Sequence, residues 1–144
     1  MEFKDKIVLV ADKANLNGHI YPLAELEKIV QDNKDKVIYG TIGMPKVVPV
    51  GRGFDTNPLY VLDVEKQAFA NEIVGVVDNQ LLVNIKVLDT PKGLLFKEMI
   101  ENMKHEDIHF RTAGLCNFET ANEKGALVIK NFTLCSINYV NNPA

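Results

Sequence analysis

The chain has 144 residues and a formal net charge of −3, from 16 basic and 19 acidic side chains. This length fits a single domain that buries a core of its own. The basic residues form no stripe along the chain, so we expect no nucleic acid partner. The longest apolar runs are far shorter than the roughly 20 residues of a membrane span, so we expect no membrane partner. The N-terminal sequence MEFKDKIVLV lacks the features of a signal peptide, which predicts synthesis in the cytoplasm.

The first third of the chain predicts a strand, a turn and a helix. Residues 6–11 are an apolar run of strand length, and the segment NLNGHIYP that follows carries turn-forming asparagines and a glycine. After Pro22, apolar residues recur at helical spacing over residues 23–33, with charges on the opposite face. We therefore expect a helix there.

The segment from Met44 to Pro58 is rich in proline and glycine, a composition that disfavours regular structure. We predict an extended surface loop or arm at about residues 46–58. Its apolar residues are candidates for binding a partner protein, because an arm of this kind becomes ordered against a neighbouring subunit. These candidates are Val47, Val48, Val50 and Phe54.

The rest of the chain predicts a hairpin, a second helix and further strands. Residues 72–88 contain two β-rich runs separated by Asp78-Asn79, and residues 90–104 have helical periodicity. Strand-like runs follow over residues 109–118, 126–134 and 136–140, with a turn at 122–125. The predicted class is α+β: a mainly antiparallel, barrel-like β structure with two main helices, in one domain over residues 1–144.

Four short segments, in this order, resemble the prohead core protein proteases of tailed phages, whose fold is similar to that of herpesvirus assemblin. They are NGHIYP at residues 17–22, GTIGMP at 40–45, VLDTPKG at 87–93 and RTAGL at 111–115. This resemblance to the capsid maturation proteases implies a prohead-protease-like fold.

The resemblance also implies where catalytic residues belong, and this chain departs from the pattern there. Met44 stands at the histidine position, and its thioether cannot act as a general base near neutral pH. Arg111 stands at the position of the nucleophilic serine. Thr112 is one residue further on, and on a strand it would point to the opposite face. We therefore predict no catalytic residues and a protein that is not an enzyme.

Other polar residues offer two weaker hypotheses. His105 and His109 have the i, i+4 spacing of two metal ligands on a helix, but the segment matches no metal signature, so we expect no metal and no cofactor. His109, Thr112 and Cys116 were also weighed as an unusual base and nucleophile set. Both cysteines, Cys116 and Cys135, lie in apolar strand contexts, which favours buried free thiols.

The sequence thus predicts a non-enzymatic structural protein of the phage head, made in the host cytoplasm and located in the virion. We expect a decoration or cement subunit that binds the major capsid protein or other head proteins and forms a homo-oligomer on the capsid. Two alternatives remain open: a regulator or inhibitor of the prohead protease, and an active maturation protease with a rearranged site.

Overall fold

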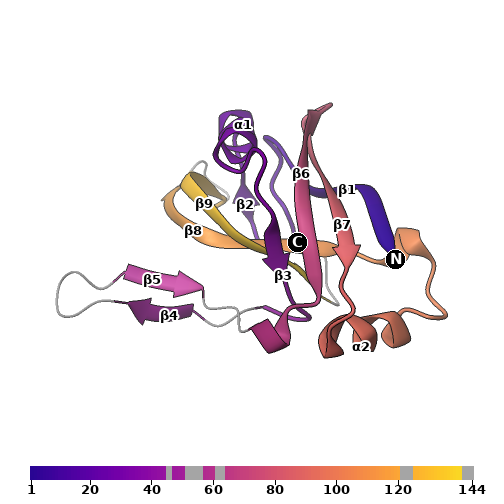
Figure 1. The fold of residues 1–144 in the computed structure, drawn as a ribbon. Coiled ribbons are helices and arrows are strands. Elements are labelled where there is room, and N and C mark those ends of the chain that lie inside the picture. Colours follow the sequence, from indigo (N-terminus) through magenta and orange to yellow (C-terminus); the bar gives the residue numbers. More distant parts are fainter. Residues whose placement is uncertain (45–46, 51–56, 61–63, 121–124, 141–144) are drawn as a thin grey trace.

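The computed structural model describes residues 1–44, 47–50, 57–60, 64–120 and 125–140 (Figure 1). Three sheets and two α-helices make up the described chain. The helices are α1 (Leu23–Asp32) and α2 (Pro91–Met99), with short 3₁₀ turns η2 (Val64–Lys66) and η3 (His105–Asp107). The strands are β1 (Glu2–Val10), β2 (His19–Ile20), β3 (Ile38–Gly40), β4 (Val47–Val50), β5 (Asn57–Tyr60), β6 (Phe69–Val77), β7 (Gln80–Val87), β8 (Phe110–Thr120) and β9 (Leu127–Tyr139). The predicted α+β class is confirmed.

The first sheet has the order β1-β7-β6-β3 and is antiparallel throughout. Its centre is the predicted β6–β7 hairpin. Asp78 and Asn79 form the turn with φ values of 51° and 62°, which is the left-handed conformation that a two-residue hairpin requires. The expected turn chemistry is therefore confirmed.

The second sheet has the order β2-β9-β8, with β2 parallel to β9. β9 is one strand of 13 residues, where the sequence predicted two, because the β8–β9 ladder absorbs irregularities at two points instead of ending. The predicted turn between β8 and β9 lies at residues 122–125, and only Gly125 of it is among the described residues.

The two sheets meet where β3 approaches the end of β9. The main-chain N–H of Thr41 donates to the Asn138 side chain over 2.9 Å, and Tyr139 N–H donates to Thr41 O over 3.1 Å. Asn71, on β6, donates from Nδ2 to Ile137 O over 3.1 Å. Gly40 makes this approach possible: a Cβ there would lie 1.7 Å from Ile137 O. These contacts form the polar seam, which consists of Gly40, Thr41, Asn71, Ile137 and Asn138.

Opposite the polar seam, the two sheets are not joined by a ladder. β1 and β8 are the end strands of their sheets, and within the described chain no backbone hydrogen bond pairs them. Aromatic packing holds them together at one end, where the Phe3 and Phe110 ring centroids are 5.5 Å apart. The structure is thus barrel-like but open on this side.

The core is aromatic beneath the first sheet and aliphatic beneath α1. The rings of Phe69, Phe96 and Phe110 meet edge to face, with centroids 4.8 to 6.0 Å apart. On the other side, α1 buries Leu26 and Ile29. Both α1 and the core it covers were expected from the helical spacing of its apolar residues.

Helix α2 differs from its prediction in length and in orientation. Thr90 caps it by accepting a hydrogen bond from Gly93 N–H at 3.1 Å, and the helix ends at Met99. Only Gly93 and Phe96 of the helix are buried, because the chain docks it through Phe96. Of the apolar residues on the predicted helical pattern, Ile100 is buried, and the other four are exposed: Leu94, Leu95, Met99 and Met103.

The predicted irregular arm contains regular structure. β4 and β5 pair antiparallel in a separate two-stranded ribbon that extends away from the other sheets in Figure 1. Pro49 lies opposite Pro58, so the strands pair although the composition disfavours strands. The side chains of Val47, Val48 and Val50 are not described, and Phe54 lies outside the described residues.

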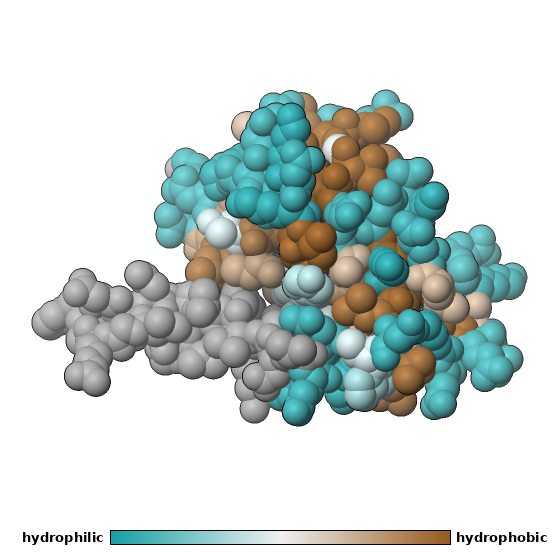
Figure 2. Space-filling model, in the orientation of Figure 1, coloured by the Kyte–Doolittle hydropathy of each residue, from teal (hydrophilic) through white to brown (hydrophobic). Residues whose placement is uncertain are grey.

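Among the described residues, no helix has the length and apolar character needed to span a membrane. Part of the exposed apolar surface lies on one hairpin. Figure 2 shows apolar surface over the β6–β7 hairpin beside the hydrophilic α1, and β6 contributes the exposed residues Val74 and Val77.

The polar seam gives a direct prediction for stability. In Gly40→Ala, the new methyl group would overlap Ile137 O, so β3 and β9 must separate. We expect the free energy of unfolding to fall by about 3 kcal/mol. Urea denaturation followed by circular dichroism measures it, and a loss below about 1 kcal/mol would contradict the role given to this contact. Ala24→Gly on the exposed face of α1 is the control, with a loss of about 1 kcal/mol.

Candidate functional site

The NGHIYP segment folds into a compact loop around Asn15. The Asn15 carboxamide oxygen accepts from the main-chain N–H groups of Asn17, at 2.9 Å, and His19, at 3.1 Å. Gly18 supplies the positive φ of 73° that closes the loop. His19 then enters β2, which pairs with β9. The motif thus fixes His19 beside the second sheet.

Tyr21, two residues later, anchors this loop to the core. Its ring meets Phe132 of β9 edge to face, with centroids 5.4 Å apart. Glu25 of α1 accepts hydrogen bonds from the main-chain N–H groups of Asn131 and Phe132, at 3.0 and 3.2 Å. The loop, α1 and β9 are thereby held in one arrangement.

A cavity of about 180 Å³ opens between this loop and β8. Met44 and Arg111, which are 67 positions apart in the sequence, both line it, together with Thr112. The resemblance assigned the first two to the base and nucleophile positions of one catalytic site. Such positions must lie close together in space, and here they line one cavity. The other lining residues include His19 and Cys116.

Comparisons with known proteins identify the fold. No family model matches the chain, and no curated protein matches it by sequence. Among solved structures, it is similar to the bacteriophage T4 capsid assembly protease, gp21, with a TM-score of 0.76 and 20% sequence identity. The likeness covers 99% of this chain and 82% of the T4 chain. The fold is like that of a capsid protease. The expected prohead-protease-like fold is therefore supported, and at this identity the likeness concerns the fold alone.

The cavity's side chains have limited acid–base chemistry at the expected positions. Met44 is 45% exposed at the cavity and offers no basic atom. Arg111 is partly exposed, whereas Thr112 is 8% exposed, although both line this cavity. A buried hydroxyl reaches a substrate poorly.

The two thiols are free but only partly buried, so the prediction of buried thiols is wrong in that respect. Cys116 lines the cavity, and desolvation followed by the charge of Glu25 raises its pKa. Desolvation likewise raises the pKa of Cys135, which lies at a different groove beside β3. Cys116 is therefore a protonated thiol at neutral pH, and a protonated thiol is a weak nucleophile.

The histidine hypotheses change in the structure. His105 lies in η3, and its ring contacts Phe3 at 4.8 Å between centroids. The η3 turn ends at Asp107, so His105 and His109 do not lie on one helix. No group of three or more metal-ligating side chains occurs in the part of the chain that the structure describes. His109 lines a different cavity from Thr112 and Cys116, which separates that proposed set.

His19 is the cavity residue that sequence reasoning overlooked. The sequence predicts a turn at NLNGHIYP and assigns no role to its histidine. The sequence does contain a signal for this placement. A turn whose main chain is hydrogen-bonded to Asn15 holds His19 in a fixed position. Only the pairing of β2 with β9 in the folded structure reveals that His19 shares a cavity with Thr112 and Cys116 of β8.

The raised pKa of Cys116 predicts its pH dependence. In a Cys135→Ala variant, alkylation of Cys116 by iodoacetamide at pH 8 should be about fivefold slower than in the denatured chain, and its rate should still be rising with pH where the rate of the denatured chain has levelled off. The reaction is followed by mass spectrometry. Rapid labelling below pH 7 would indicate a stabilised thiolate and contradict this environment. Cys116→Ala, which leaves Cys135, is the matched control.

Proposed function

We propose that this chain is a non-catalytic protein of a phage head, in which a protease-like fold serves as a structural element. The observation that supports this most is the cavity shared by Met44 and Arg111. The resemblance assigns these two residues to one catalytic site, which requires them to lie close together. Neither side chain, however, can act as the base or the nucleophile of a serine protease.

Serine-type proteolysis needs a base that takes the proton of the nucleophile and donors that stabilise the oxyanion. A thioether does not accept that proton, and a guanidinium has no nucleophilic lone pair at physiological pH. A fold can keep its shape when these side chains change, since shape depends on the core and function depends on the site.

The β4–β5 ribbon is our proposed attachment element, with the major capsid protein as its partner. A two-stranded ribbon gains little stability by itself, so contact with another surface would stabilise it. Directly opposite prolines occupy a non-hydrogen-bonded pair, so the donors missing at Pro49 and Pro58 belong to the outer edges of the ribbon. The ribbon is thus protected against further strand addition, and we assign its binding to side chains, including Val47, Val48, Val50 and Phe54.

This role corresponds to a decoration or cement subunit in the virion. Many copies arranged on a capsid would supply the homo-oligomeric contacts, and the ribbon would bridge to the capsid surface. One structural neighbour is the capsid assembly protease of bacteriophage T4, and a protein of this fold fits a place in head assembly.

One observation favours a second function, an active protease with a rearranged site. His19, Thr112 and Cys116 line the same cavity, and this set contains a potential base and two potential nucleophiles. The burial of Thr112 and the raised pKa of Cys116 weigh against it.

The first prediction separates these two functions. The purified chain, incubated with a capsid or scaffold precursor from the same phage, should release no fragments by gel and mass analysis. Trypsin shows in parallel that the precursor is accessible to cleavage. Specific cleavage that is lost in His19→Ala, and in either Thr112→Ala or Cys116→Ala, would replace our proposal with the rearranged protease.

The second prediction concerns the ribbon. Replacing residues 47–60 with a short Gly-Ser linker removes β4 and β5, which pair only with each other in the described chain. The melting temperature should change by less than about 3 °C, and binding to expanded capsids should be lost in a sedimentation assay. Wild-type occupancy by the truncated protein would place the interface elsewhere. Unfolding would place the ribbon in the structural core.

A further inference from the structure

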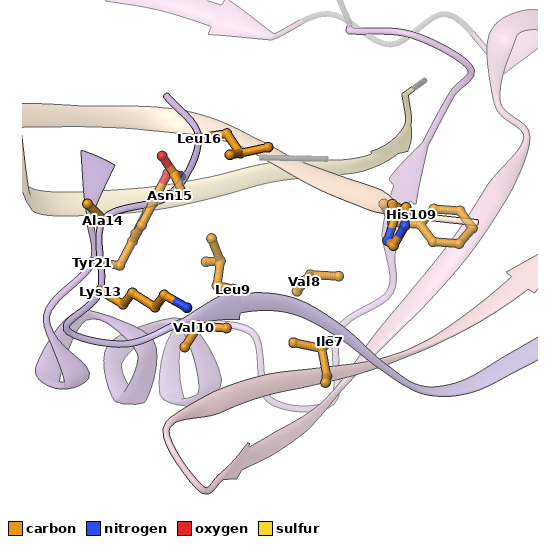
Figure 3. A pocket seen from close by; sticks show the side chains of 11 residues that line it. Ile7, Val8, Leu9, Val10, Lys13, Ala14, Asn15, Leu16, Tyr21 and His109 are labelled. Carbon is orange, nitrogen blue, oxygen red and sulfur yellow. The ribbon is translucent and has the colours of Figure 1, made fainter. Parts of the chain in front are cut away.

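A second cavity, of about 420 Å³, lies along the open side of the barrel (Figure 3). Ile7, Val8, Leu9 and Val10 of β1 form one wall. The start of β8 closes one end through His109 and Phe110, as its lining residues show. This cavity contains neither Met44 nor Arg111, although it adjoins the cavity described above.

The wall formed by β1 presents an unused strand edge. β1 pairs with β7 on one side only, and no described strand pairs with its other edge between Ile7 and Val10. Alternate peptide groups of an edge strand point away from its partner, so they are available to another main chain. Beyond this stretch the edge is closed, since Ala11 bridges to Tyr21.

The lining is apolar and partly accessible. Leu16 is 79% exposed, Ile7 is 49% exposed and Val10 is 40% exposed, whereas Val8 and Leu9 are only 8% and 6% exposed. Figure 3 shows Val8 and Leu9 on the side of β1 that faces Leu16, whereas Ile7 points away from it. Large aliphatic side chains left in solvent beside an unpaired strand are features of sites that accept an extended peptide.

The unpaired edge of β1 and the apolar lining together indicate which class of ligand this cavity can bind. An extended peptide supplies N–H and C=O groups at the spacing of β1 and also side chains for the apolar wall. A helix has its main-chain groups paired internally, and a lipid chain has none, so neither satisfies the edge. Four residues of β1 span about 13 Å, which matches a peptide stretch of four or five residues.

The charges at the cavity restrict the sequence of such a peptide. Lys13 lines it, and no carboxylate is among its lining residues. A lysine or arginine in the bound stretch would therefore meet the like charge of Lys13 and no opposite charge, which disfavours it.

We propose that this cavity, here called the β1 groove, binds an extended, aliphatic and non-basic segment of a partner protein, which adds as a strand to the edge of β1. The bound segment fills the opening between β1 and β8. This inference does not rest on the proposed function, because strand addition requires neither hydrolysis nor attachment of the ribbon.

Binding is tested with a fluorescent hexapeptide that alternates threonine and valine and ends in glycine amide. Fluorescence anisotropy gives its affinity, and mass analysis after each titration reports whether it stays intact. Binding to the wild-type chain is expected, with amide chemical-shift changes in NMR spectra that centre on Ile7 to Val10. Absence of binding up to millimolar concentration, or shifts that centre on Val74 and Val77, would overturn the proposal.

Two N-methylated peptides, with the methyl groups on either set of alternate amides, test strand addition itself. Each peptide keeps all its side chains but lacks the N–H donors along one of its two edges. At least one should bind about tenfold more weakly than the parent. Equal affinity of all three peptides would refute main-chain pairing. A version with lysine in place of the central valine should also bind more weakly, and equal affinity would refute the charge argument.

Variants of the protein locate the apolar contact. Leu16→Thr should weaken binding at least fivefold, whereas Val77→Thr, which also places threonine at an exposed aliphatic residue, should not. Melting temperatures establish that both variants fold. Equal losses would refute the β1 groove as the site. If wild-type protein without peptide shows the same amide shifts on concentration, a second copy occupies the groove and the proposed partner is wrong.

Discussion

The close contact between β3 and β9 is the constraint on which the arrangement of the two sheets depends. A strand can approach another backbone this closely only where no side chain intervenes, and Gly40 provides that position against Ile137 O. Asn71 and Asn138 are buried there, and their amides donate or accept hydrogen bonds across the gap. Buried amides are costly when unpaired, so this network also specifies the register in which the sheets meet.

The cavity follows from this arrangement. Once β9 is fixed against β3, its partner β8 and the loop around His19 take defined places, and Met44, just after β3, comes to line the same cavity as Arg111. The position of the cavity thus depends on backbone contacts, and its chemistry depends on side chains that contribute little to those contacts. The same backbone arrangement can therefore carry different side chains at the cavity.

The two sheets are joined where β3 meets β9, and on the other side β1 and β8 are left as the end strands of their sheets. The ribbon carries its own protection, because Pro49 and Pro58 remove donors from its outer edges. The edge of β1 has no proline between Ile7 and Val10 and is lined by aliphatic side chains. The contrast between a blocked edge and an open one is the physical reason for treating them as different kinds of interface.

Local interactions determined what the sequence alone could predict. The apolar spacing of α1, the Asp78-Asn79 turn and the α+β class follow from contacts between near neighbours, and the motif segments indicated a protease-like fold. Tertiary structure decided what depends on distant partners. The pairing of β4 with β5, the exposure of α2 and the partial exposure of the thiols required packing that no local pattern contains. His19 joined the cavity for the same reason, since β8 lies some 90 residues beyond it in the sequence and only the folded sheets bring the two together.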